Sequence, residues 1–264
     1  MNTKSLSKIE DHAKHLNNAW KTGEGVQPIT VLDPELSIDE AYQVQLHTME
    51  DNVKSGQKIT GKKIGLTSKA MQDMLGVGEP DYGHLLDQME VENGGTISFK
   101  QVLQPKVEGE LAFILKDDLV GPNVTTWDVL QATDAVVPAL EIVDSRIKDW
   151  KITLADTVAD NASSGLYVLG GRPKKLADID IKRIGMTLHK NNALQNTGVG
   201  AAALGDPAKC VAWLANKLAT YGITLKAGEV ILSGALSAAI EAEPGDEFYA
   251  KFAEFGEVRV SFSE

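Results

Sequence analysis

The fold of this chain of 264 residues is best read from the stretch Pro105-Lys106-Val107-Glu108-Gly109-Glu110-Leu111-Ala112-Phe113-Ile114-Leu115. It is an apolar run with two acids near its start. From Leu111 onward it reads as a buried strand, because it is short, apolar and followed by charged residues 116–118. Residues i and i+2 of a strand point to the same face. We therefore expect the side chains of Glu108 and Glu110 to lie side by side, with Gly109 leaving room for a group to approach the backbone.

A second apolar run, residues 135–143, carries a single acid, Glu141. A carboxylate in such a strand is costly unless it is paired or metal-bound, and two carboxylates as close as Glu108 and Glu110 repel unless a proton or a cation lies between them. Three carboxylates from two strands, with no cysteine or histidine nearby, suit a hard divalent cation such as Mg²⁺ or Mn²⁺. The alternative is a set of solvated edge residues. Glu141 favours the metal, because charged residues are seldom buried without a partner.

The composition is that of an ordinary soluble globular protein, with 43% hydrophobic and 24% charged residues. The formal net charge of -11 argues against a nucleic-acid or anionic-membrane partner. Cys210 is the only cysteine, so no intrachain disulfide can form, which fits a reducing compartment. The polar N-terminus lacks the apolar segment of a signal peptide, and no apolar run reaches membrane-spanning length. These features predict a cytoplasmic protein.

Local patterns predict the elements before the carboxylate strands. Residues 5–22 have helical spacing, and Ser37 followed by Glu40 resembles the capping box of a second helix. Residues 58–67 read as a strand, in which Lys62 and Lys63 face opposite sides. One of these lysines could point into a cleft, although two solvated lysines are the simpler interpretation. A short helix is expected over residues 68–75, followed by a turn-rich loop.

The second half of the chain is predicted to be mostly β-structure. A small polar patch, residues 159–165, precedes a strand at 166–169, and Asn191-Asn192 suggests a hairpin turn. Residues 198–203 match G-x-G-x-x-A, but no apolar strand precedes them, so we reject a dinucleotide site. A helix is expected after Asp206-Pro207, with Asp206 as its N-cap. Residues 229–235 read as a strand, and residues 248–262 as a closing hairpin.

Several of these segments, taken in order, resemble one enzyme family. They are Gly61-Lys62-Lys63-Ile64-Gly65-Leu66-Thr67, Glu79-Pro80-Asp81-Tyr82-Gly83, Val107-Glu108-Gly109-Glu110, Ala139-Leu140-Glu141, Asp160-Asn161-Ala162-Ser163, Ile231-Leu232-Ser233-Gly234-Ala235 and Pro244-Gly245-Asp246. The set is similar to the 2-keto-4-pentenoate hydratases of the fumarylacetoacetate hydrolase superfamily, whose close relatives include the 4-oxalocrotonate decarboxylases. Each motif alone is weak, but the ordered set spans roughly residues 35–262.

The resemblance implies an α+β fold, with a mixed β-rich fumarylacetoacetate hydrolase-like core. An N-terminal helical region, residues 1–60, would pack on a catalytic domain, residues 61–264. The alternative is to count the two as one domain. The metal ligands implied by the matching positions are Glu108, Glu110 and Glu141, and the ion would be Mg²⁺ or Mn²⁺.

Other site residues follow from the resemblance position by position. Lys63 would be the cleft lysine, leaving Lys62 outside. Asp81 matches an acidic position typical of the hydratases, where the decarboxylases usually have an aliphatic residue. Ser233 matches a hydroxyl residue that can bind the substrate carboxylate, and Ser163 or Ser164 would line the same pocket. One departure is Asp206, where relatives often have histidine; substrate range or assembly could differ if that histidine shapes the pocket or an interface.

The activity implied is metal-dependent hydration of 2-hydroxypenta-2,4-dienoate (2-keto-4-pentenoate), or a close analogue, to 4-hydroxy-2-oxopentanoate, in meta-cleavage catabolism of aromatic compounds. The dienol would ketonise to a conjugated 2-keto-enoate, to which water adds at C4. Lys63 and Asp81 would form the proton-transfer and water-orienting pair, and we expect a depressed pKa for Lys63 beside a metal and apolar walls. The family is oligomeric, so we expect a homo-oligomer that can associate with a sister pathway enzyme.

Three other functions stay open on the residues. A metal-dependent 4-oxalocrotonate decarboxylase is the main alternative, although no basic residue stands out for its second carboxylate. Hydrolysis of an acylpyruvate would need a histidine–glutamate arrangement, for which His12 and His15 make no convincing motif. A non-catalytic subunit would have no need to retain Lys63, Asp81 and three carboxylates.

Overall fold

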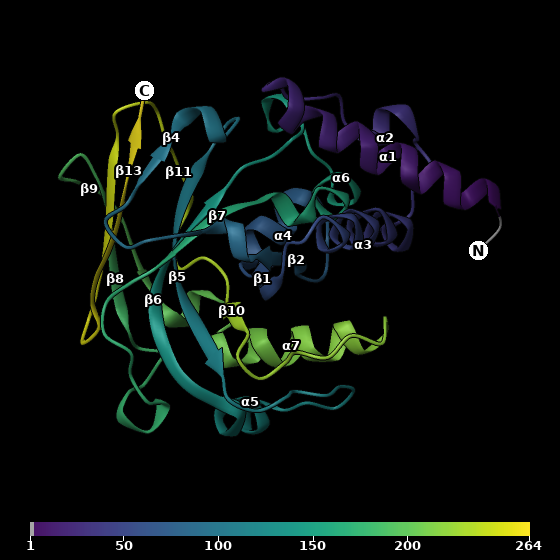
Figure 1. The fold of residues 1–264 in the computed structure, drawn as a ribbon. Coiled ribbons are helices and arrows are strands. Elements are labelled where there is room, and N and C mark those ends of the chain that lie inside the picture. The colour runs from purple at the N-terminus through teal and green to yellow at the C-terminus, as the bar shows by residue number, and fades with distance from the viewer. Residues whose placement is uncertain (1–2) are drawn as a thin grey trace.

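The computed structural model describes residues 3–264, which form two β-sheets flanked by helices (Figure 1). The larger sheet contains eight strands, namely β1 (Ile59–Gly65), β2 (Asp81–Leu86), β3 (Glu90–Val91), β5 (Lys106–Leu115), β6 (Thr133–Val143), β7 (Ser164–Leu169), β10 (Val230–Leu232) and β11 (Ile240–Glu241). Its order is β2-β1-β10-β5-β6-β7-β3, and β11 pairs with β5. Because β1 and β10 run parallel while β5 and β6 run antiparallel, the sheet is mixed.

The second sheet has five strands, namely β4 (Thr96–Ser98), β8 (Gly185–Lys190), β9 (Ala193–Val199), β12 (Glu247–Phe252) and β13 (Gly256–Ser263), in the order β4-β13-β12-β8-β9. It lies at the left of Figure 1, beside β5 and β6. The predicted hairpins are confirmed. Asn191 and Asn192 link β8 to β9 with positive φ angles of 51° and 64°, which asparagine tolerates better than most residues.

Helices lie on the other side of the larger sheet (Figure 1). They are α1 (Thr3–Thr22), α2 (Ile29–Leu32), α3 (Ile38–Lys54), α4 (Lys69–Leu75), α5 (Thr126–Ala132), α6 (Leu154–Ala159) and α7 (Pro207–Ala219). Ser37 forms the predicted capping box with Glu40. Asp206 caps α7 by accepting a hydrogen bond from the Ala208 amide at 3.0 Å. The α7 cap is therefore intact with aspartate at that position.

The N-terminal helices bury their apolar faces against the rest of the chain. Ile9 and Leu16 of α1 and Tyr42 of α3 belong to the same buried cluster as Phe113 and Leu140 of the central strands. This continuity favours counting the whole chain as one domain, while the boundary near residue 60 stays a prediction. Among residues 3–264, no helix combines the length and the apolar character needed to cross a membrane.

Strands β5 and β6 form the centre of the larger sheet and carry the candidate metal ligands. Their antiparallel register places Glu108 directly opposite Glu141, and Glu110 opposite Ala139. All but one residue of β6 is buried, which is why this strand reads as a nearly continuous apolar run. Directly opposed like charges destabilise a sheet, so this pairing needs a compensating charge at the site.

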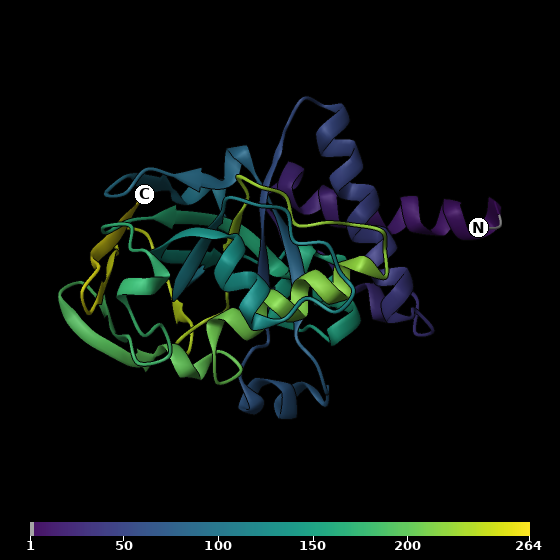
Figure 2. The same cartoon turned by 90° about the horizontal axis from the view of Figure 1, so that it is seen from below.

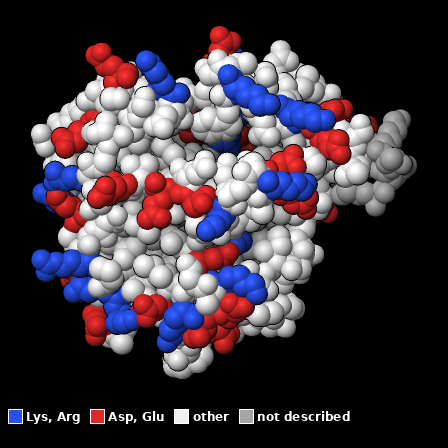
Figure 3. All heavy atoms as spheres, in the orientation of Figure 1, with Lys and Arg blue, Asp and Glu red and all other residues white. Residues whose placement is uncertain are grey.

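Charged side chains elsewhere are dispersed. On the face drawn in Figure 3, acidic and basic groups are interspersed, so the net charge of -11 is not gathered there into one acidic field.

Candidate active site

Three buried carboxylates converge where β5 meets β6. Glu108, Glu110 and Glu141 each offer an oxygen within 4.8 Å of the others, and Glu141 is only 1% exposed. Burial and the neighbouring charge of Glu141 raise the pKa of Glu108 to about 7 and hold the pKa of Glu110 well above its usual value. Like charges held this close in a dry site call for a cation among them.

The unpaired oxygens of this cluster fit a divalent cation. Glu110 Oε2 accepts a hydrogen bond from the Gly234 amide at 2.9 Å, but its Oε1 has no partner among the described residues. Both oxygens of Glu141 also lack hydrogen bonds, although Lys63 Nζ lies 3.2 Å from Oε1 as an ion pair. Buried polar atoms are rarely left unsatisfied. Glu110 Oε1 and Glu141 Oε2 have neither a hydrogen bond nor an ion pair among residues 3–264. Three carboxylates with such free oxygens match the all-oxygen coordination of Mg²⁺ or Mn²⁺.

Lys63 and Asp81 lie beside this cluster, on the paired strands β1 and β2. Gly65 stands directly opposite Asp81 in that pairing. A Cβ atom built on Gly65 would lie 2.2 Å from Asp81 Oδ1 and 3.3 Å from Lys63 Nζ. Glycine is therefore needed at position 65, because any side chain there would collide with the Asp81 carboxylate and crowd the Lys63 ammonium. Both residues are buried.

Without a bound metal, the chain's own charges shift the Lys63 pKa in the direction opposite to the depression expected beside a metal. Burial alone would lower this pKa, but the charges of Glu141, Asp81, Glu108 and Glu110 outweigh burial and raise it. Burial has the opposite effect on Asp81, whose pKa is raised above its ordinary value.

Lys62 is also not where we expected it. Instead of pointing into water it is 2% exposed, and its Nζ lies 2.5 Å from Glu229 Oε1. The two adjacent lysines thus occupy two buried ion pairs on opposite faces of β1, with Glu141 on one face and Glu229 on the other. Burial lowers the pKa of Lys62.

A cavity of about 710 Å³ opens beside these groups. Lys63, Asp81 and Glu108 are in its wall, whereas Glu110 and Glu141 are not among the residues that line it. The cavity therefore brings the predicted proton-transfer pair and one edge of the carboxylate cluster into contact with a common space.

Only one of the three predicted substrate-binding serines lines the cavity. Ser163 lines the cavity and its hydroxyl lies 3.3 Å from that of Thr157. Ser164 is buried outside the lining, and its hydroxyl has no hydrogen-bond partner in the described part of the chain. Ser233 is also buried outside the lining, and its hydroxyl donates to the Leu111 carbonyl at 2.8 Å. Of the three, Ser163 is the one in direct reach of a molecule in the cavity.

The polar patch before β7 forms an unusual turn that shapes the cavity wall. Asn161, Ala162 and Ser163 all have φ near +50°, a conformation that is costly for residues other than glycine. The Asn161 side chain holds the turn in place by accepting a hydrogen bond from the His84 amide at 2.7 Å and donating one to the His84 carbonyl at 2.9 Å. His84 is itself hydrogen-bonded inside the fold, since its Nδ1 lies 3.0 Å from Gln45 Oε1.

Sequence patterns did not identify several wall residues. Thr157 donates a hydrogen bond of 3.5 Å to Asp81 Oδ2, and Trp150 and Lys106 also line the cavity. Lys106 had a detectable signal, because it is two residues before Glu108 and so shares its face of β5. Thr157 and Trp150 belong to a separate segment of the chain, and no sequence pattern indicated that they line the cavity.

Gly109 of β5 is packed against the second sheet. We expected Gly109 to leave room for a ligand at the backbone. A Cβ on Gly109 would instead lie 3.0 Å from Met186 Cε, so the side chain that approaches this glycine belongs to the second sheet.

Alanine at Gly65 should damage catalysis more than folding. Its methyl group would displace the Asp81 carboxylate, and a displacement of about 1 Å at a catalytic group can cost on the order of 10²-fold in rate. We expect kcat to fall by about 10- to 100-fold, measured by steady-state kinetics alongside thermal unfolding. Gly185→Ala is the matched control, because a Cβ there meets nothing within 4 Å. An unchanged kcat in Gly65→Ala would contradict the placement of Asp81.

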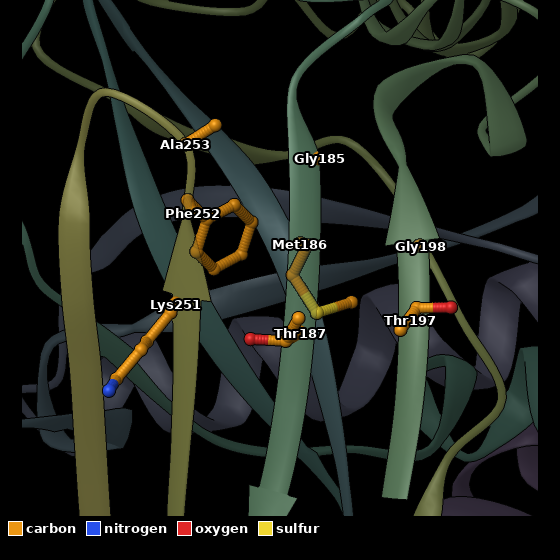
Figure 4. Close-up of a pocket in the computed structure, with 8 residues that line it drawn as sticks. All are labelled: Gly185, Met186, Thr187, Thr197, Gly198, Lys251, Phe252 and Ala253. Carbon is orange, nitrogen blue, oxygen red and sulfur yellow. The ribbon is translucent and has the colours of Figure 1, made fainter. Parts of the chain in front are cut away.

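A separate groove of about 530 Å³ lies on the second sheet between β12, β8 and β9 (Figure 4). It is lined by Met186, Thr187, Thr197 and Phe252, and the side chain of Lys251 points away from Met186 and Phe252. Lys251 is the one titratable residue in its lining. The groove therefore offers no group of residues comparable to the carboxylate cluster.

Comparisons with known proteins find a matching family and relatives that cover most of the chain. Residues 77–263 match the family model described as fumarylacetoacetate (FAA) hydrolase C-terminal. The chain is 46% identical over 258 residues to a 2-hydroxyhexa-2,4-dienoate hydratase from Comamonas testosteroni, covering 97% of this chain and 98% of that protein. It is 49% identical over 216 residues to a 2-hydroxypent-2,4-dienoate hydratase from Pseudomonas putida, covering 81% and 97%.

A solved structure covers nearly the same length. The 4-oxalocrotonate decarboxylase from Pseudomonas putida G7, complexed with magnesium and adipate, matches with a TM-score of 0.96 at 35% identity, covering 99% of both chains. The same decarboxylase is also known complexed with calcium and acetate. Together with the carboxylate cluster, these complexes support a divalent metal as the cofactor of the present protein.

The two mixed sheets and the buried carboxylate cluster define an α+β enzyme with the fumarylacetoacetate hydrolase fold. Within that superfamily, the chain belongs to the 2-keto-4-pentenoate hydratase family. The predicted fold and the predicted hydro-lyase class are thereby confirmed.

Proposed function

We propose that this enzyme hydrates 2-hydroxypenta-2,4-dienoate, or a close analogue, to 4-hydroxy-2-oxopentanoate in the catabolism of aromatic compounds by meta-cleavage. A divalent ion, Mg²⁺ or Mn²⁺, would be held by Glu108, Glu110 and Glu141. The observation that carries the proposal is the meeting of this carboxylate cluster with the Lys63–Asp81 pair at one cavity. The names of the similar hydratases point to the same reaction.

The overall reaction needs two proton transfers to carbon and one addition of water. Loss of the 2-hydroxyl proton and protonation at C5 convert the dienol to a conjugated 2-keto-enoate. Water then adds at C4, and protonation at C3 restores the ketone. A divalent ion bound at the three glutamates supplies Lewis-acid polarisation of the substrate carboxylate and 2-oxygen, and fixes their orientation.

Side chains in the cavity wall would carry out the proton transfers and orient the water. The Lys63 ammonium has three N–H donors and lies beside the cavity, so it can donate a proton at carbon. The Asp81 carboxylate can accept a proton from the water that adds at C4, and the Thr157 hydroxyl, 3.5 Å from Asp81 Oδ2, helps to orient it. Ser163, beside Thr157, can hold a substrate or water oxygen in place. Ser164 and Ser233 would act less directly, as supports of the wall.

Decarboxylation of 4-oxalocrotonate is the second candidate, because the solved decarboxylase shares the fold over nearly its whole length. The same chelation would suit that reaction. The presence of Asp81 favours hydration, since decarboxylation adds no water that an acid would have to orient.

Hydrolysis of an acylpyruvate and a purely structural role receive less support. His12 lies 3.1 Å from Asp33 Oδ2, and His15 lies 2.8 Å from the Gln27 carbonyl, both in α1. The described wall of the cavity contains no histidine, so the water-activating pair of a hydrolase is missing from it. Burying three carboxylates and Lys63 together would be a costly arrangement for a subunit that catalyses nothing.

The test is a product assay that separates the first two candidates. The purified enzyme, with Mg²⁺ or Mn²⁺, is given 2-hydroxypenta-2,4-dienoate and 4-oxalocrotonate in separate reactions. We expect 4-hydroxy-2-oxopentanoate from the first and no CO₂ from the second. CO₂ release without hydration would transfer the assignment to the decarboxylase.

The finer expectations about the protein's setting belong to the same proposal. We propose a cytoplasmic homo-oligomer that can associate with a sister enzyme of the pathway, with no nucleic-acid or membrane partner. Light scattering after size-exclusion chromatography would give the subunit number. Buried Cys210 is compatible with a reducing compartment.

A further inference from the structure

The cavity is larger than a five-carbon acid requires. Its volume of about 710 Å³ lies in the range of pockets that hold drug-sized ligands, about 300–1,000 Å³. Three of its four charged wall residues, Lys63, Asp81 and Glu108, gather around the carboxylate cluster, where the reacting part of the substrate would bind. The rest of the cavity is available for a substrate tail.

The remaining wall is uncharged except for Lys106, and it is mostly hydrocarbon. It includes Leu66, Met71, Ile152, Trp150 and Leu236. The two serines in this part of the wall are engaged with the chain's own backbone. The Ser68 hydroxyl accepts from the Met71 amide at 3.3 Å, and the Ser237 hydroxyl lies 3.5 Å from the Ala238 carbonyl. A tail in this region would meet few free polar groups.

The segment from Leu66 to Met71 is held over the cavity by a strained turn. Leu66 has φ of 55°, which costs energy for a residue with a side chain. Gln72 Nε2 donates to the Leu66 carbonyl at 2.9 Å, and the Leu204 amide donates to the Thr67 carbonyl at 3.1 Å, which fixes the turn. In Figure 2 this segment and α4 project from the body as the blue helix at the bottom. Met71 remains 41% exposed in the cavity wall, although large apolar side chains are usually buried.

Lys106 does not make this region a site for a second carboxylate. Its ammonium lies 3.4 Å from Glu241 Oε1 and 4.8 Å from the centre of the Trp150 ring. The charge is therefore already met by a carboxylate and an aromatic face. A carboxylate on a substrate tail would have to compete with Glu241 for this ammonium, and the negative charge of Glu241 would repel it.

We propose that this part of the cavity, bounded by Leu66, Met71, Ile152 and Trp150, is a subsite for an uncharged hydrocarbon tail at C5 of the substrate. The enzyme would then prefer 2-hydroxy-2,4-dienoates with such a tail over the five-carbon acid and over diacids. This inference rests on the proposed hydratase function. Methionine is suited to such a subsite, because its flexible thioether adapts to tails of different shape.

The first test uses the unmodified enzyme with its metal. Rates are compared for 2-hydroxypenta-, 2-hydroxyhexa- and 2-hydroxyhepta-2,4-dienoate, and for 2-hydroxyhepta-2,4-diene-1,7-dioate. Each buried carbon should raise kcat/KM by about fourfold, as expected for burial of one methylene. The diacid should be hydrated at least about tenfold less efficiently than the uncharged seven-carbon substrate, because its second charge must be desolvated.

The second test makes the wall polar. Met71→Gln keeps the length of the side chain, and we expect it to lower kcat/KM for the seven-carbon substrate by about tenfold while changing that for the five-carbon substrate less than twofold. Lys69→Gln is the control, since Lys69 is on the same short helix but outside the cavity lining.

The outcomes separate this inference from the function on which it rests. Equal loss on both substrates in Met71→Gln, a flat series of rates, or a preference for the diacid would each overturn the subsite. Failure of the unmodified enzyme to hydrate any of the four compounds would overturn the hydratase function itself.

Discussion

Replacing Glu141 by glutamine is expected to lower metal-dependent hydration on the order of 10³-fold. Glu141 is the carboxylate that both faces Glu108 across the sheet and pairs with Lys63. Glutamine keeps its size but removes the charge that a divalent ion needs, and the Lewis-acid contribution lost with that ion amounts to several kcal/mol of activation free energy. Steady-state kinetics and isothermal titration with Mg²⁺ would measure turnover and binding separately.

Glu229→Gln is the matched control for this variant. Glu229 is another buried glutamate paired with a lysine, but its partner is Lys62 and it is outside the cavity lining. We expect Glu229→Gln to lower the unfolding temperature while leaving Mg²⁺ affinity intact. If Glu141→Gln kept its metal-dependent rate within tenfold of the unmodified enzyme, Glu141 would not be a ligand.

The second large effect is expected from Lys63→Met. This change removes the only ammonium group in contact with Glu141 among the described residues, and positioned proton transfer contributes about 10²- to 10⁴-fold in rate. We expect kcat to fall by that amount while Mg²⁺ still binds, because the three glutamates remain. The pair of measurements distinguishes loss of proton transfer from loss of the metal.

Lys62→Met provides a control from the adjacent residue. It leaves Glu229 buried without its ion-pair partner, so the free energy of unfolding should fall by about 3–5 kcal/mol, as when one member of a buried pair is removed. Turnover per folded enzyme should change little. Equal losses of kcat in the two variants would mean that Lys63 supports the fold rather than the reaction.

The local features of this fold were predictable because they depend on neighbours in sequence. Ser37 and Asp206 cap helices at the positions where the sequence predicted caps. Asn191-Asn192 turns a hairpin for the conformational reason that the pattern suggested. Strands β5 and β6 were predicted because each is a short apolar run that contains only one or two acidic residues.

The site was predictable only in part. Two-residue periodicity places Glu108 and Glu110 on one face, but the pairing of Glu108 with Glu141 depends on a register set across the intervening loop. Lys62 is buried in an ion pair with Glu229, which is 167 residues away in the sequence. No local sequence pattern indicates such a contact. The wall residues Thr157 and Trp150 are likewise contributed by tertiary packing.

The direction of the Lys63 pKa shift depends on all the charged groups around its ammonium. Burial and a nearby metal ion, the two influences expected from the sequence, both lower the pKa of a lysine. Four carboxylates surround this ammonium in the folded chain, and their attraction exceeds the cost of burial. The motif identified the residue, whereas only the three-dimensional arrangement gives the charges that act on it.

The most direct measurement of the central claim is a metal add-back experiment on the unmodified enzyme. The protein is stripped with a chelator, given 2-hydroxypenta-2,4-dienoate, and titrated with Mg²⁺ or Mn²⁺ while the product is followed by NMR. Our account predicts no turnover without metal, and 4-hydroxy-2-oxopentanoate forming in proportion to one bound ion per site. Full hydration by the stripped enzyme would contradict it.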